Sequence, residues 1–385
     1  MMTRVSFVFC LCAVALVCGC GSRSGLGAAK KGMAAFREGR YEKAIAHFTA
    51  ATERISNSPE LYYHLGLAHL ERGNLEPAQE AFRVALDLDP GEGEANILGA
   101  LGQVAFRQQD YTNALVSLER ALAAARDDGT AVRVLTAMGA VEACRQNPAL
   151  ASLHYLRALR LDRMYAPAYY NLAVLYQDQC GLYEEARDCL GMFMSVADKK
   201  EKKREMAEKR VNRLKTKLER DAASANPRRD STRAASLMQE GVSAYIAKQY
   251  PKAIKAYKDA LAADPLTFSA ALGLGTAYRQ QGMRADALEA FRRAAEINPA
   301  DQDSYYQAAD LALQLRQPDE AVRLLTQAIA RSPYNPASVR LMALACHAQG
   351  RVPEAAAYGA FYLALAPEAE PDRASFERWV QSLKR

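Results

Sequence analysis

The stretch FSAALGLGTAYRQQGMRADALEAFRRAAEINP, residues 268–299, decides the fold. Small residues such as Gly275 and Ala287 alternate there with large ones such as Phe291, and the stretch ends at Pro299. Small side chains let two helices approach to about 8–10 Å, and large side chains fill the space that remains. The stretch therefore predicts a pair of closely packed helices.

The same pattern recurs along the chain, with a spacing of 34 residues in most steps. Counting from the first residue of each unit, a small residue fills the eighth position: Gly32, Gly66, Gly102, Gly139, Ala173, Gly241, Gly275, Ala309 and Ala343. An alanine recurs in the second half of each unit: Ala44, Ala78, Ala114, Ala151, Ala186, Ala253, Ala287, Ala321 and Ala355. Ala186 comes one residue late, which predicts a one-residue insertion near Cys180-Gly181 in the fifth unit.

These units resemble the tetratricopeptide repeat (TPR) in nearly every signature position. In 268–299 the matching residues are Leu274-Gly275, Tyr278, Gly282, Ala287, Phe291, Ala294 and Pro299. The resemblance implies an all-α protein, a TPR-type α-solenoid that forms a right-handed superhelix of helix pairs. We expect about nine repeats in two arrays, five over 28–198 and four over 234–367. In Ser58-Pro59 and in Asn335-Pro336, the first residue is predicted to be the N-cap and the proline the first helical residue. Each pair begins the first helix of its repeat.

One repeat cannot bury its apolar face alone, so the ends of an array need polar caps. Residues 199–221 are mostly charged but carry an apolar stripe, which predicts an amphipathic helix that caps the first array: Ala207, Val211, Leu214 and Leu218. A similar stripe predicts a capping helix within 368–385: Phe376, Trp379, Val380 and Leu383. We interpret 199–233 as a basic capping helix and linker.

A continuous superhelix is the alternative to two arrays. Ala173 and Gly241 are 68 residues apart, twice 34, so a degenerate tenth repeat fits the gap. Against it, Glu219 stands where the repeat needs a small residue, and we favour two arrays.

The composition is that of a folded helical chain. Of the 385 residues 50% are hydrophobic and 24% are charged, and the net charge is +6. Beyond the first 25 residues no apolar run approaches the roughly 20 residues that span a bilayer. These values exclude a polytopic membrane protein, a disulfide-rich miniprotein and a mainly β chain.

The first residues, MMTRVSFVFCLCAVALVCGCGSRSG, have the layout of a secretory signal: Arg4 precedes the apolar region Val5 to Val17. The following Cys18-Gly19-Cys20 resembles a bacterial lipobox, which implies that Cys20 is lipidated. We therefore expect a lipoprotein signal peptide over 1–19, a lipidated tether over 20–27 and a place in the bacterial cell envelope, on the outer membrane facing the periplasm. An ordinary signal peptide and a retained signal anchor are the alternatives.

No catalytic pattern is present. The chain has no P-loop, HExxH or GxSxG motif, and its five histidines form no ligand pattern. We therefore expect no enzyme, no cofactor, no metal site and no small-molecule substrate. Cys144, Cys180 and Cys189 lie in neighbouring repeats, and either a disulfide among them or buried free thiols fits the sequence.

The TPR resemblance also implies a partner-binding groove, because the second, fifth, ninth and twelfth positions of first helices line the concave face in that family, and the sixth and thirteenth positions flank it. Aromatic residues and arginine carry much of the energy of protein interfaces, so these positions suit a peptide segment. The groove residues expected in the first array are Phe36, Arg37, Tyr63, Leu67, Gln103, Phe106, Arg107, Tyr170 and Gln177. Those in the second array are Tyr245, Arg279, Tyr306 and Arg340.

The basic segment is the second candidate site. Residues 199–220 hold eleven Lys or Arg and four Glu, and we expect a basic patch at Lys202, Lys203, Lys209, Arg210 and Arg213. Such a patch attracts anionic lipid, lipopolysaccharide or an acidic partner, and a solvated capping face is the plain alternative. Nucleic acid is not expected as a partner of an exported protein.

The sequence thus predicts a non-enzymatic protein-protein interaction scaffold of the bacterial envelope, bound to the membrane through its lipid anchor. Its partners would be proteins or peptide segments of an envelope complex of the pilus, secretion, outer-membrane or murein machinery. A soluble periplasmic chaperone-like carrier and a polyanion or lipid binder acting through 199–220 are the alternatives.

Overall fold

The computed structural model describes residues 21–89, 91, 93–198, 201, 203–224, 230–368, 370 and 372–383, and these contain α-helices, one π-helical turn and no strand. Cys20 and Lys202 lie outside the described residues. Two compact units are present: one reaches residue 181 and includes 188–211, and the other comprises 182–187 with 212 onward. The division thus falls inside two helices, whereas the sequence pattern places it at 199–233.

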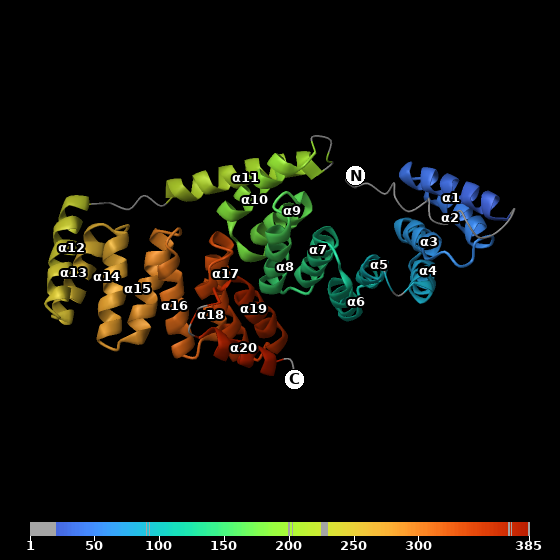
Figure 1. Ribbon diagram of the computed structural model, residues 1–385. Helices are drawn as coiled ribbons and strands as arrows, with labels where there is room; N and C mark the ends of the chain where they lie inside the picture. The colour runs from blue at the N-terminus through green and yellow to red at the C-terminus, as the bar shows by residue number, and fades with distance from the viewer. Residues whose placement is uncertain are drawn as a thin grey trace. The chain divides into compact units, whose positions relative to one another are not determined.

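Helices follow one another in pairs along the chain (Figure 1). The first five pairs are α1 (Gly21–Arg37) and α2 (Tyr41–Thr52), α3 (Pro59–Arg72) and α4 (Leu75–Leu88), α5 (Glu94–Arg107) and α6 (Tyr111–Ala124), α7 (Asp128–Cys144) and α8 (Pro148–Leu161), and α9 (Ala166–Leu175) and α10 (Tyr183–Val196). The unpaired helix α11 (Lys203–Ser224) follows.

Four further pairs make up most of the second unit, in which α12 to α16 lie side by side (Figure 1). They are α12 (Ser231–Ile246) and α13 (Tyr250–Ala263), α14 (Phe268–Gln280) and α15 (Arg284–Ile297), α16 (Gln302–Gln314) and α17 (Pro318–Arg331), and α18 (Pro336–Ala348) and α19 (Val352–Leu365). The unpaired helix α20 (Arg373–Ser382) ends the described chain. The nine pairs form the α-solenoid of TPR repeats that the sequence predicts.

The small residue at the eighth position of a repeat packs on a large side chain of its own second helix. A Cβ added to Gly66 would lie 2.6 Å from the ring of Phe82, and one added to Gly139 would lie 2.5 Å from the ring of Tyr155. Gly32, Gly102, Gly241 and Gly275 face Phe48, Leu118, Tyr257 and Phe291 in the same way. Glycine is therefore required there by close approach, as the alternation of small and large residues predicts.

The turn between the two helices of each repeat contains one residue in the left-handed region. The nine described residues with positive φ are these turn residues, one per repeat: Gly39, Gly73, Gln109, Gln146, Gly181, Lys248, Gly282, Arg316 and Gly350. Four of them are not glycine, and a residue with a Cβ is strained in this conformation by about 1–2 kcal/mol.

Replacing these four residues by glycine should stabilise the chain. We expect each of Gln109→Gly, Gln146→Gly, Lys248→Gly and Arg316→Gly to add about 0.5–1 kcal/mol, because relief of strain exceeds the extra chain entropy of glycine. Urea unfolding followed by circular dichroism measures the effect. The control is the reverse substitution Gly73→Ala, at φ 89°, which should destabilise the chain. A lower urea midpoint for the four glycine variants than for the unchanged chain would contradict the strain argument.

The insertion predicted near Cys180-Gly181 takes the form of a π-helical turn, η1 (Tyr176–Cys180), at the end of α9. A π-turn holds one residue more than an α-turn, so the extra residue is absorbed and Ala186 still reaches a fully buried position. Gly181 then makes the left-handed turn with φ 67°.

Both predicted helix starts are confirmed, but only one of the two N-cap side chains makes a capping hydrogen bond. Asn335 caps α18, since its side chain accepts hydrogen bonds from the backbone N–H groups of Ala337 and Ser338. Ser58 is the N-cap residue of α3, but its hydroxyl donates to Glu60 Oε2 at 2.8 Å and caps no backbone group. The nearby carboxylate is the stronger acceptor for the hydroxyl.

Candidate partner-binding face

First helices of neighbouring repeats contact one another directly. Each helix from α1 to α9, and each from α12 to α20, packs on the next one in the chain, and the most extensive contacts between next-nearest helices join first helix to first helix: α1 with α3, α3 with α5, α5 with α7, α7 with α9, α12 with α14 and α16 with α18. Within each unit the first helices therefore line one side of the stack. We call the outward side of these helices the first-helix face, and the predicted groove residues lie on it.

In the first unit this face carries half-buried apolar side chains. Phe36 packs on the core around Phe48, and Tyr63 and Leu67 pack on the core around Phe82. The Tyr63 ring lies 5.8 Å from that of Phe82, and burial raises the pKa of Tyr63. Each side chain is anchored on one side and accessible on the other, which is how an interface residue stays rigid before binding.

The same face has exposed polar positions. Arg37 of α1 and Gln103 of α5 are exposed, and Phe106 lies half-buried beside Tyr111 with ring centroids 6.0 Å apart. Polar side chains also join adjacent first helices: Arg107 donates to the Leu70 carbonyl at 2.5 Å and lies 3.4 Å from Glu71. These contacts hold the spacing between neighbouring first helices.

Two predicted groove residues are contacted by α11. The Lys203 ammonium lies 4.8 Å from the ring centroid of the buried Tyr170, and Arg210 donates to Gln177 Oε1 at 2.9 Å. Arg210 also lies 3.4 Å from Asp178. Cations predicted for the basic patch thus meet residues predicted for the groove, and Ala207 and Val211 of the same helix are buried.

The second unit shows the same arrangement at its C-terminal end. Arg340 lies 3.4 Å from Asp372 and its guanidinium lies 5.6 Å from the ring of Phe376. His347 and Trp379 lie 5.5 Å apart in an edge-on contact, so Trp379 anchors α20 on α18. Arg340 is therefore engaged by the chain itself.

The remaining predicted residues of the second unit stay accessible. Tyr245 and Tyr306 are half-buried, and Arg279 is exposed while it donates to Gln307 of the next first helix. Sequence reasoning missed Val242 and Ile246 of α12, which are 39% and 74% exposed. Val242 is at the ninth position of its repeat and Ile246 at the thirteenth, a flanking position, so the repeat pattern could have identified both.

Several titratable groups are buried within the repeats. His154 is 5% exposed, and burial lowers its pKa to about 3, helped by the charge of Arg157. Burial raises the pKa of Cys180 to about 11 and that of Cys346 to about 12, so both thiols stay protonated near neutral pH. Cys144, Cys180, Cys189 and Cys346 are all free, but only Cys346 is buried: Cys144 is exposed and Cys180 and Cys189 are half-buried, so the three thiols of neighbouring repeats are free without being the buried thiols that the sequence suggested.

Within the described ranges, no group of three or more His, Cys, Asp or Glu side chains is placed to hold a metal ion. In the same part of the chain, no helix combines the length and the apolar character that crossing a membrane requires.

Models of the tetratricopeptide repeat match residues 30–93, 238–302 and 306–370, and a second such model matches 95–128 and 166–191. The chain belongs to the tetratricopeptide repeat family. TPR proteins bind peptides or proteins and typically act as non-enzymatic scaffolds.

Individual relatives are distant. The chain is 28% identical over 276 residues to Superkiller complex protein 3 of Mus musculus, an alignment that covers 70% of this chain and 17% of that protein. Among solved structures, PilF of Pseudomonas aeruginosa is 18% identical with a TM-score of 0.41 and covers 65% of this chain and 96% of its own. MamA from Desulfovibrio magneticus is 20% identical with a TM-score of 0.38, and the match covers 46% of this chain and 97% of the MamA chain. The chain spans about a sixth of the length of the curated relative.

Proposed function

We propose that this TPR protein is a scaffold of the bacterial cell envelope that binds partner proteins or peptide segments along its first-helix face and so helps to assemble an envelope complex. It works without catalysis, cofactor or metal. The machinery of pili, secretion, outer-membrane insertion or murein synthesis would supply the partner.

One observation carries the proposal. Half-buried apolar side chains lie on the first helices of three consecutive repeats: Phe36, Tyr63 and Leu67 pack on the core with one side, and Phe106 packs beside Tyr111. Since α1 contacts α3 and α3 contacts α5, these side chains belong to one continuous surface. Aromatic anchors flanked by arginine contribute strongly to binding and lose little side-chain entropy, so the surface suits an extended or helical peptide.

The envelope location rests on the first 25 residues of the sequence. An apolar signal that ends in Cys18-Gly19-Cys20 supports export and lipidation at Cys20. Two or three acyl chains anchor a protein durably, whereas one chain binds the membrane only marginally. We therefore place the chain on the outer membrane, facing the periplasm.

Charge reversal on the first-helix face should abolish partner capture. We expect Arg37→Glu with Gln103→Glu to lower capture of crosslinked envelope proteins about tenfold, because both side chains are exposed beside the apolar anchors. The control is Arg83→Glu with Thr112→Glu, which makes the same charge change at exposed positions of α4 and α6. Equal capture by both double variants, with unchanged circular-dichroism melts, would refute this face as the binding surface.

Removal of the lipidated thiol should release the chain from the membrane. We expect Cys20→Ala to lose palmitate labelling and to move from the membrane fraction to the soluble fraction, because no acyl chain can then be attached. Continued labelling would reject the lipobox assignment. A soluble pool of the unchanged protein would favour the periplasmic carrier over the anchored scaffold.

A further inference from the structure

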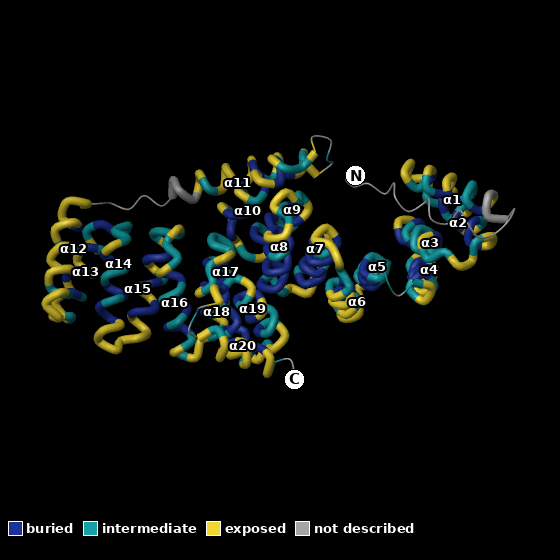
Figure 2. Tube along the Cα trace, viewed as in Figure 1, coloured by how far each residue is buried: buried dark blue, intermediate teal, exposed yellow. Residues whose placement is uncertain are grey.

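The cations of α11 fall into two groups according to what they contact, although the helix as a whole is mainly exposed (Figure 2). In 203–210 every cation has a partner in the chain. Lys203 lies over Tyr170, Arg204 donates to the Met194 carbonyl at 2.7 Å, Lys209 donates to Glu205 at 2.6 Å, and Arg210 meets Gln177. The charge of this half is therefore largely compensated.

The second half of the helix differs. Residues 212–224 hold Arg213, Lys215, Lys217 and Arg220 against two acids, Glu219 and Asp221, for a net charge of +2. Arg213 and Arg220 make no ion pair or hydrogen bond with any residue that the structure describes. The cations without such a contact, Arg213 and Arg220, thus lie beyond Arg210, and Arg213 belongs to the predicted basic patch.

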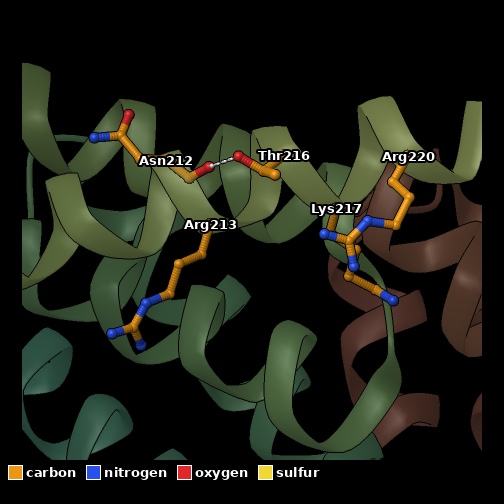
Figure 3. A pocket seen from close by; sticks show the side chains of 5 residues that line it. All are labelled: Asn212, Arg213, Thr216, Lys217 and Arg220. Carbon is orange, nitrogen blue, oxygen red and sulfur yellow. Dashed lines mark hydrogen bonds between the residues drawn. The ribbon is translucent and has the colours of Figure 1, made fainter.

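Three of these cations share one side of α11. Arg213, Lys217 and Arg220 line an open surface pocket together with Asn212 and Thr216, and Figure 3 shows the three long side chains descending on the same side of the helix. Residues three and four apart occupy one face of a helix, so the spacing of 213, 217 and 220 produces this row. The Lys217 ammonium lies 4.5 Å from the ring centroid of Tyr183, which fixes its direction.

The lack of exposed apolar side chains beside these three cations favours an acidic polymer over an anionic lipid surface as the partner. A helix that binds a bilayer surface places large apolar side chains between lipid headgroups. Within 212–220 the only large apolar residues are Leu214, which is buried, and Leu218, which is half-buried, so the row offers charge without an apolar anchor. Charge complementarity alone therefore selects the partner.

We infer that Arg213, Lys217 and Arg220 form an acidic-peptide site that binds a carboxylate-rich, extended segment of a partner protein. Arg213 and Lys217 are about 6 Å apart along the helix axis at 1.5 Å per residue, and alternate side chains of an extended strand are about 6.6 Å apart. Carboxylates on alternate residues thus meet successive cations, and the arginines can bind them bidentately. The inference shares with the proposed function only the class of partner, since it uses different side chains.

The test is binding of a fluorescent decaglutamate peptide to the full chain, measured by anisotropy at low salt. Arg213→Glu with Lys217→Glu and Arg220→Glu should weaken binding about tenfold or more. The matched control reverses the exposed Lys215, Lys252 and Lys255, which changes the net charge by the same amount. Lys215 points roughly 160° away from Arg213 around α11, so this control should keep binding within about threefold.

Three results would overturn the site: equal weakening by the two triple variants, no weakening by the first, or no peptide binding by a chain that binds phosphatidylglycerol vesicles. The last result would assign the row to a membrane surface. The single variant Arg220→Glu, at an exposed position, repeats the test if the triple variant melts early. Arg37→Glu with Gln103→Glu should retain decaglutamate binding, so failure of the first-helix face and failure of the acidic-peptide site are distinguishable.

Discussion

Replacing Phe82 by alanine is expected to lower the free energy of unfolding of the first unit by about 3–5 kcal/mol. The side chain is fully buried, and its ring fills the space over Gly66 between α3 and α4. Removing it leaves a cavity that the neighbouring helices cannot close without shifting the stack. Urea unfolding followed by circular dichroism measures the loss.

The matched test is a double-mutant cycle with Gly66→Val. Alone, this substitution places a Cβ within 2.6 Å of the Phe82 ring and should destabilise by about 1–3 kcal/mol through overpacking. In the double variant the new side chain enters the vacated space, so the combined loss should be smaller than the sum. Gly191→Ala, at a helical glycine with nothing within 4 Å, should instead stabilise; additive losses in the cycle would contradict the small-against-large packing.

The second large effect concerns pH. The folded-state pKa of His154 is lowered to about 3 by burial, whereas the unfolded value is about 6.5. Below pH 6.5 His154 is protonated in the unfolded chain but stays neutral in the folded chain. The free energy of unfolding therefore decreases as pH falls toward 3. We expect a loss of about 2–3 kcal/mol between pH 7 and pH 4.5 from this residue.

His154→Leu removes that titration and should flatten the pH dependence of unfolding over the same window. His64, with its pKa lowered to about 4 chiefly by burial, acts in the same direction and leaves a residual slope. Urea midpoints at pH 7 and pH 4.5 for both proteins give the comparison. Parallel losses in the two proteins would show that His154 is not responsible.

Local packing explains why so much of the fold follows from the sequence. The eighth-position glycines and the rings of Phe82 and Tyr155 interact within one repeat, so a short pattern contains both partners of each contact. The one-residue delay at Ala186 likewise indicates the π-turn. The repeat spacing fixes where the flanking helices pack, so an inserted residue must be accommodated locally. The left-handed turns at Gln109 and Arg316 could not be predicted from the sequence, because the residue there is not glycine.

The candidate site was harder to predict because its contacts join segments with no shared pattern. The frame places Tyr170, Gln177 and Arg340 on the first-helix face, yet Lys203, Arg210 and Asp372 of the unpaired helices engage them. A charge count over 199–220 likewise cannot tell a cation that is paired within the chain from one that is available. Both distinctions depend on side-chain geometry.

The most direct test of partner binding by the first-helix face is site-specific photocrosslinking in living cells that produce the full chain. A photoreactive residue at Gln103 of α5 is compared with one at Glu119 of α6, two exposed positions on the two helices of the same repeat. We expect a discrete crosslinked partner from Gln103 and none from Glu119. Crosslinking to the same partner from Glu119 alone, or with equal yield from both positions, would contradict the account.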